Sequence, residues 1–189
     1  MSQKPPSTNN PLRFDNLYHL IDCLMLFGAA LHMQGSGCRL QLARSRKRWA
    51  SMGMAIIVAK CQDPNMNLFD FRIDSTGTDR IRFSTRTSSF LMHAYRNWYW
   101  SGEATMPADT VLDENAILFW LLGHFSEGRV VMPGMGNPSA LAKQLVSLTK
   151  AVHAKVVGDA VVTSPKDDNK ILKWISVWVP ESVLTRRQQ

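Results

Sequence analysis

LYHLIDCLMLFGAALHM, residues 17–33, is an apolar stretch that decides much of the fold. Its apolar residues recur at helical spacing and Gly35 and Gly37 follow, so the pattern predicts a helix that ends near residue 34. A second apolar stretch, NAILFWLLGHF at 115–125, has the same character. Helices that are apolar on most sides are buried, so these two predict a core built on their packing.

Further strands and helices are expected after each apolar helix. The first is followed by alternating strand patterns at 39–45, 67–74 and 80–86 and by helical patterns at 47–61 and 88–100. The second is followed by a strand at 129–132, a helix at 138–153 and a closing hairpin of 155–162 and 171–179. This repetition predicts an α+β fold with pseudo-two-fold symmetry. The expected organisation is a flexible tail at 1–12, a first repeat at 13–108, a second, shorter repeat at 109–180 and a tail at 181–189.

The chain is basic, and its charge is unevenly placed. With 22 Lys and Arg against 15 Asp and Glu, the formal net charge is +7. No acid occurs between Cys23 and Gln62, where six residues are basic and most of these are Arg. A guanidinium suits bidentate contacts to phosphates and base edges. The distribution therefore favours a polyanionic partner, with nucleic acid as the first candidate.

The strand RIRFSTR at 80–86 shows how such a partner would be met. With a period of two residues, Ile81 and Phe83 point to one face while the arginines point to the other. A plain solvated strand usually mixes both charges, whereas this face has no acid. Arg39 and Gln41 share a face of the strand at 39–45 in the same way, a pairing suited to base edges or to a plain surface strand. We expect nucleic-acid contacts from Arg39, Gln41, Arg44, Arg46, Lys47, Arg48, Arg72, Arg80, Arg82, Arg86 and Arg129.

The cysteines and the lengths of the apolar runs argue against a disulfide-stabilised, a zinc-stabilised and a membrane-spanning protein. Cys23, Cys38 and Cys61 are odd in number and form no CxxC pair, so they fit neither a disulfide framework nor a structural zinc site. No apolar run reaches transmembrane length, and the polar, Pro-rich start MSQKPPSTNN resembles neither a signal peptide nor a transit peptide. We expect a reducing intracellular compartment and no membrane partner.

Residues 83–128, FSTRTSSFLMHAYRNWYWSGEATMPADTVLDENAILFWLLGHFSEG, resemble the LAGLIDADG homing endonucleases. In that family a strand leads to a helix with an aromatic end, a Gly-containing turn, a Pro and an acidic link, and then to an apolar helix that ends in an acid and Gly. LMLFGAALHMQGSG at 24–37 resembles the first signature helix more loosely. The resemblance covers most of residues 15–180. It implies two signature helices packed at the centre, with antiparallel sheets forming a saddle over a duplex. The small residues that would pack these helices are Gly28, Ala29, Ala30 and Gly123.

The resemblance also implies a metal site, from which this chain departs. Each signature helix of the family ends in an acid that binds a divalent metal between the scissile phosphates. The first acid position falls on Gln34, or on Met33 if the register shifts, and neither is a carboxylate. The second falls on Glu127, or on His124 one turn earlier. At most one acid of two remains, so we expect no catalytic residue and no cofactor.

These observations predict a non-catalytic nucleic-acid-binding protein. We expect structured RNA to be favoured over DNA, because Arg clusters and exposed aromatics suit folded RNA. Trp49, Trp98 and Trp100 are candidates for stacking on bases, although core packing is the expected role of most of them. The resemblance suggests a mitochondrial ribosomal protein, part of a ribonucleoprotein, or an intron maturase-like factor. One alternative is an active homing endonuclease that cuts double-stranded DNA with Mg²⁺ bound by Glu127. Another is a small protein that binds a protein partner through an apolar face.

Overall fold

The computed structural model describes residues 17–45, 72–74, 80–125, 130–151 and 153–178 of the chain. Its helices are α1 (Leu17–Phe27), α3 (Leu91–Trp98), α4 (Glu114–His124), α5 (Pro138–Thr149) and α6 (Pro165–Ile175). Its strands are β1 (Ala30–Gln34), β2 (Gly37–Ser45), β3 (Arg72–Asp74), β4 (Arg80–Ser84), β5 (Val130–Pro133), β6 (Lys155–Val157) and β7 (Ala160–Thr163). Among these helices, none has the length and apolar character needed to cross a membrane.

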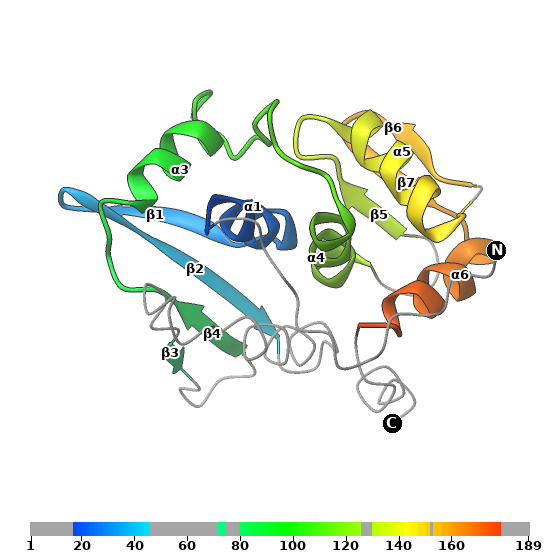
Figure 1. Cartoon of the computed structure of the whole chain (residues 1–189), viewed down its shortest axis with the longest axis horizontal. Coiled ribbons are helices and arrows are strands. Elements are labelled where there is room, and N and C mark those ends of the chain that lie inside the picture. Colours follow the sequence, from blue (N-terminus) through cyan, green and yellow to red (C-terminus); the bar gives the residue numbers. More distant parts are fainter. Residues whose placement is uncertain (1–16, 46–71, 75–79, 126–129, 152, 179–189) are drawn as a thin grey trace.

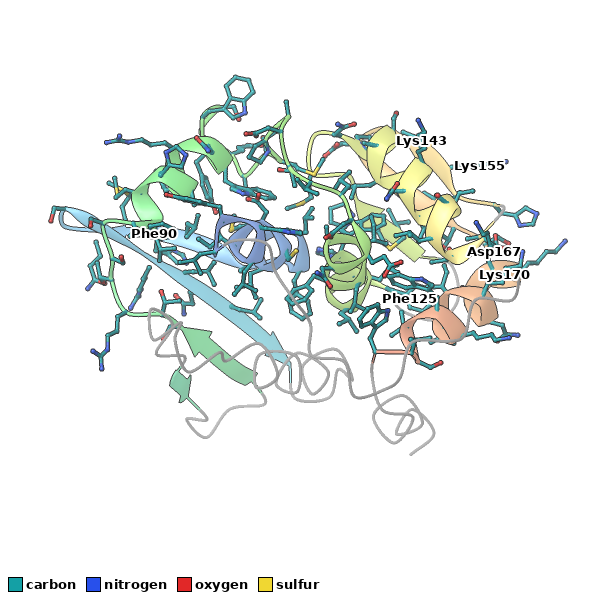
Figure 2. The ribbon with its side chains drawn as sticks, in the orientation of Figure 1. Phe90, Phe125, Lys143, Lys155, Asp167 and Lys170 are labelled. Carbon is teal, nitrogen blue, oxygen red and sulfur yellow. The ribbon has the colours of Figure 1, made fainter. Side chains whose placement is uncertain are left out.

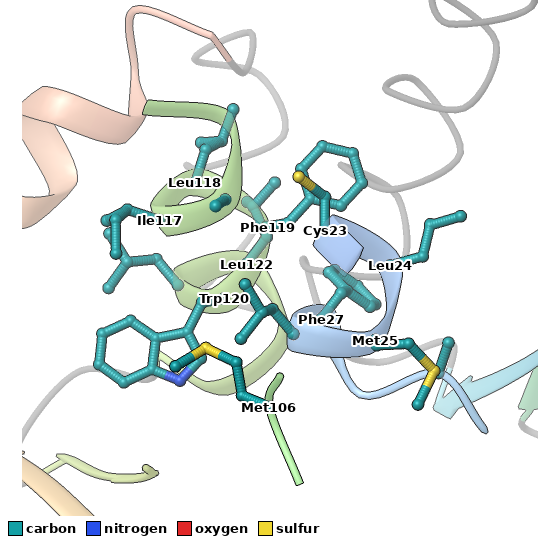
Figure 3. Packing of buried hydrophobic residues seen from close by; sticks show 14 of the residues in the cluster. Cys23, Leu24, Met25, Phe27, Met106, Ile117, Leu118, Phe119, Trp120 and Leu122 are labelled. Carbon is teal, nitrogen blue, oxygen red and sulfur yellow. The ribbon is translucent and has the colours of Figure 1, made fainter. Parts of the chain in front are cut away.

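The apolar helices α1 and α4 lie side by side at the centre of the molecule, where Figure 1 shows both almost end-on. Phe27 of α1 and Phe119 of α4 meet edge to face, with ring centroids 6.4 Å apart. Most side chains of both helices are buried, and they form the middle of one continuous apolar core (Figure 3). The expectation of a core built on two apolar helices is confirmed.

Gly123 allows α4 to approach α1 this closely. A Cβ atom at this position would lie 2.7 Å from the carbonyl carbon of Phe27 and closer still to its oxygen. The contacted atoms are backbone, which cannot move aside without shifting α1. Of the small residues expected at the helix crossing, Gly123 has this role, whereas Gly28 follows the end of α1 with a positive φ of 98°. Ala29 and Ala30 lie beyond that end.

Each central helix is followed by an antiparallel sheet. The strand order of the first sheet is β1-β2-β4-β3, and that of the second is β5-β7-β6. Their chain order makes β5 the counterpart of β2, with β7 matching β4 and β6 matching β3. Among the described residues, the second sheet has no counterpart of β1. The α+β, pseudo-two-fold fold is therefore confirmed, with a smaller second sheet.

The inner face of the first sheet packs on the core. Leu31 of β1 pairs with Leu40 of β2, and both side chains are buried, as is that of Leu42. The backbone N–H of Leu40 also donates to the hydroxyl of Thr85, 3.0 Å away, which joins β2 to the segment after β4. This packing holds the opposite, outer face of the sheet toward solvent.

Two expected element boundaries are wrong. The helix expected over 17–33 ends at Phe27, and residues 30–34 form β1. The expected closing strand at 171–179 is wrong, because residues 165–175 form α6. The hairpin is instead formed by β6 and β7, with Gly158 at a positive φ of 58° in its turn.

The start of α6 explains the second error. The hydroxyl of Ser164 accepts from the backbone N–H of Lys166, and Pro165 occupies the first helical turn, as is common at helix starts. Asp167, in that turn, is fully buried and accepts from the backbone N–H of His153 at 2.7 Å and from its Nδ1 at 2.9 Å. This polar segment is therefore a capped helix start, although its composition suggested a turn. The predicted helix at 47–61 lies outside the described residues, as do residues 67–71 of the predicted strand.

Substitution Gly123→Ala tests the helix crossing. Alanine normally stabilises a helix by up to about 1 kcal/mol relative to glycine. Here we expect the opposite sign, a loss of about 3 kcal/mol or more, because the methyl group would meet the backbone of Phe27. Urea unfolding measures the change. As a control, Ser147→Ala on the exposed side of α5 should change stability by less than about 0.5 kcal/mol. A stabilised Gly123→Ala variant would contradict the crossing described here.

Candidate nucleic-acid interface

The outer face of the first sheet is polar where its side chains are described. His32 of β1 pairs with Arg39 of β2, and both are exposed. Gln41 is half-buried on the same face, and Gln34 is exposed at the hairpin end. The hydroxyl of Thr87 donates to Oε1 of Gln34 over 2.8 Å. Imidazole, guanidinium and amide groups thus stand together on one side of β1 and β2.

The pairing register extends this face across β4 and β3. Arg82 pairs with Ala43 and Arg80 pairs with Ser45, so both share the face of Gln41. Arg72 of β3 pairs with Ser84 and joins them. One acid, Asp74, also lies on this face, paired with Arg82. The backbone register thus continues this face from β2 to β4 and β3.

The other predicted contact residues do not all lie on this face. Arg44 pairs with Ile81, so the register assigns it to the opposite face. Arg86 lies after the end of β4 and is exposed. Its binding role, like that of every predicted contact residue, stays a prediction. The predicted contacts that lie outside the described residues are Arg46, Lys47, Arg48 and Arg129.

Sequence reasoning missed His32, because it placed residues 17–33 in one helix. The sequence held a signal, since glycine commonly ends a helix and Gly28 is followed by the alternating residues 30–34. His32 pairs with Arg39 on the outer face of the first sheet. Like Gln41, it can both donate and accept hydrogen bonds. Thr87 was missed too, and only its contact with Gln34 places it there.

The ends of the central helices differ from the expected acid positions. Gln34 and Met33 lie in β1, away from the end of α1, which is Phe27. The last turn of α1 is apolar and buried. The last residue of α4 is His124, and Glu127 lies outside the described residues. The described ends therefore offer no carboxylate, and these side chains do not fit a hard divalent cation.

His124 links the two helix ends. Its Nε2 lies 3.0 Å from the carbonyl oxygen of Leu26, one of the last carbonyls of α1. Such carbonyls lack partners within their own helix, and a basic side chain near a helix C-terminus is favourable. The arrangement gives His124 a structural role at the crossing. No group of three or more His, Cys, Asp or Glu suited to a metal occurs within the described part of the chain.

A second polar cluster lies toward the other end of the central helices. The indole N–H of Trp98 donates to the carboxylate of Asp22 at 2.7 Å. Burial raises the pKa of Asp22, while the Trp98 hydrogen bond and the charge of His19 oppose the rise and Asp109 adds to it. This cluster joins α3 to α1.

Asp113 begins α4 beside this cluster. Its carboxylate accepts from the backbone N–H of Ala116 at 2.9 Å and lies 3.2 Å from Nε2 of His19. Burial acts to raise the pKa of Asp113, but the hydrogen bonds from His19 and Ala116 and the imidazole charge outweigh it, so the pKa lies below its ordinary value. These contacts cap the helix and tie it to α1.

Comparison with solved structures places this arrangement in a known fold. The homing endonuclease I-WcaI, solved bound to its DNA recognition sequence, superposes with a TM-score of 0.51 at 13% sequence identity. The match covers 87% of this chain and 82% of that chain. This chain has the LAGLIDADG homing-endonuclease fold. No family model matches the sequence. No curated protein matches it either.

The homing-endonuclease fold expected from the resemblance is thus confirmed. A sequence identity of 13% shows that the two chains share a fold and nothing further. I-WcaI is bound to DNA, and this finding corrects our expectation that RNA is the favoured partner. Of the three tryptophans for which base stacking and core packing were both open, Trp98 is fully buried in the core, and Trp49 lies outside the described residues. Trp100 alone of that expected trio is described as exposed.

Substitution Asp22→Asn tests the polar cluster. A raised folded-state pKa means that ionised Asp22 lowers stability as pH rises through that pKa. The amide removes this cost and keeps an acceptor for Trp98. We therefore compare the stability of Asp22→Asn with that of the unmodified chain at two pH values. The difference should favour Asp22→Asn more at pH 7 than at a pH below the ordinary pKa of 3.8. Urea unfolding at both pH values measures the difference.

The matched variant Asp22→Leu leaves the indole N–H of Trp98 without its acceptor. It should cost about 1–3 kcal/mol at acid pH and less at pH 7, where the ionised Asp22 of the unmodified chain already lowers stability. An equal change in stability for Asp22→Asn at acid and neutral pH would contradict a raised pKa of Asp22.

Proposed function

We propose that this chain binds double-stranded DNA through the outer face of the β1-β2-β4-β3 sheet and does not cut it. The observation that supports this most is the exposed, polar outer face of β1 and β2, with His32, Arg39 and Gln41 on neighbouring strands. α3 packs against β1 and β2, and the inner face of these strands is part of the core, so the outer face is presented on a packed support.

The residue types suit the major groove. A two-stranded β-ribbon fits that groove, and Arg pairs with guanine while Gln pairs with adenine, each through two hydrogen bonds. Arg72, Arg80 and Arg82, placed on the same face by register, supply charge for phosphates or further bases. The I-WcaI complex, which shares the fold, supports DNA as the partner class.

The non-cutting part of the proposal rests on the helix ends. Phosphodiester hydrolysis in this fold needs carboxylates that hold a metal, and the described ends offer Phe27 and His124 instead. The imidazole of His124 is also engaged with the Leu26 carbonyl. The proposed binding requires no cofactor. Only Glu127, outside the described residues, could supply an acid to the alternative, Mg²⁺-dependent endonuclease.

Arg39→Gln tests the interface. Fluorescence anisotropy measures the affinity for a random duplex pool. If Arg39 contacts a phosphate, we expect weaker binding and a fall of about 0.9 units in the slope of log affinity against log salt. If Arg39 contacts a base, we expect sequence preference to relax. The control is Arg96→Gln, which changes another exposed arginine, on α3 rather than on the sheet. It should leave both quantities nearly unchanged.

Two results would overturn the proposal. Equal losses in the Arg39 and Arg96 variants would remove the sheet face from the interface, and an absence of salt-sensitive affinity would remove nucleic acid as the partner. Nicking of a plasmid library that depends on added Mg²⁺ would overturn the non-cutting part alone. In that case Glu127→Gln should abolish the nicking.

A further inference from the structure

The outer face of the second sheet differs in chemistry from that of the first. The register places Val131 of β5, Val162 of β7 and Lys155 of β6 on one face. Val131 is 60% exposed, and Val157, on the same face of β6, is 62% exposed. Pro133 and Ala160 also pair on this face. Lys155 is therefore the one polar side chain among the described strand residues of this face.

On the opposite face of this sheet, β5 and β7 contribute to the core, while Val156 of β6 is exposed. Met132 and Val161 pair with each other, and both are fully buried. The exposed valines are therefore not misplaced core residues, because the core already has its own apolar set. Their face corresponds, by the pseudo-two-fold order of strands, to the polar face of the first sheet.

A valine surface cannot read DNA as a polar one can. It has neither donors nor acceptors for base edges, and the thymine methyl group is the one major-groove feature that it can contact. The second sheet is also smaller, because the described residues supply no counterpart of β1, the strand that holds His32 and Gln34 in the first sheet.

Lysines instead occur on this half of the molecule. Lys155 lies on the apolar face itself, whereas Lys143 is exposed on α5, which contacts β6 and β7 and lies outside this face. Figure 2 shows both at the end of the molecule remote from α1. Lys170, farther along this end, is already paired with Asp167, with Nζ 3.3 Å from Oδ1. An ammonium group is a compact charge suited to phosphates, which contain no sequence information.

We propose that only one half of the chain recognises the DNA sequence. The first sheet discriminates bases, and the second half binds phosphates without base discrimination. This inference rests on the proposed DNA binding and adds a division of labour to it. The recognised sequence should then be about half as long as the stretch of duplex that the protein covers.

Selection of binding sites from a random duplex library tests this division with the full chain. The expected result is one block of preferred bases next to a covered but uninformative stretch, with the covered length measured by footprinting. Two separate preferred blocks of unlike sequence would overturn the inference and leave DNA binding intact. A palindrome of two equal blocks would overturn it as well, because a second copy of the chain would then supply the other half.

A matched pair of variants assigns each half of the site. Arg39→Gln should relax preference at one or two positions, with about 5- to 150-fold less discrimination there. Lys155→Gln should weaken binding to every duplex by the same factor and lower the salt slope by about 0.9 units. Relaxed base preference in the Lys155 variant would overturn the inference. No salt-sensitive binding by the unmodified chain would instead overturn the proposed function on which it rests.

Discussion

The close crossing of α1 and α4 is the constraint on which the rest of the structure depends. Because Gly123 has no side chain, α4 approaches the backbone of α1 at Phe27, and the helix ends meet there. His124 completes the contact by reaching the Leu26 carbonyl. With the helices in this position, each sheet packs on its own side of the pair and turns its other face outward (Figure 1).

The same crossing bears on chemistry. In a fold whose cutting members need carboxylates at the two helix ends, this chain has a buried Phe27 at one end and His124 at the other. At the described helix ends, the packing therefore places apolar and imidazole groups where a metal would need carboxylates. The proposed binding face does not include these groups, because it lies on the opposite side of β1 and β2 from the core.

The two halves have diverged within a shared arrangement. The strand orders β1-β2-β4-β3 and β5-β7-β6 show a common plan, yet one outer face bears His32, Arg39 and Gln41 and the other bears Val131 and Val157. Pseudo-symmetry of the backbone does not require symmetry of function, because an outward side chain can change without disturbing the core that the inward ones form.

The sequence by itself predicted the class of the fold, because two apolar helices and the alternation in 80–86 are local patterns that burial enforces. It also predicted the arginine face, since the period of a strand is local. It failed where local cues conflict: apolar residues 30–34 continue a helical pattern but pair with β2, and the polar start of α6 hides a capped helix. Only the tertiary structure decided which residues stand at the helix ends. The close approach at Gly123 depends on contacts between residues almost a hundred positions apart, and no window of sequence contains both.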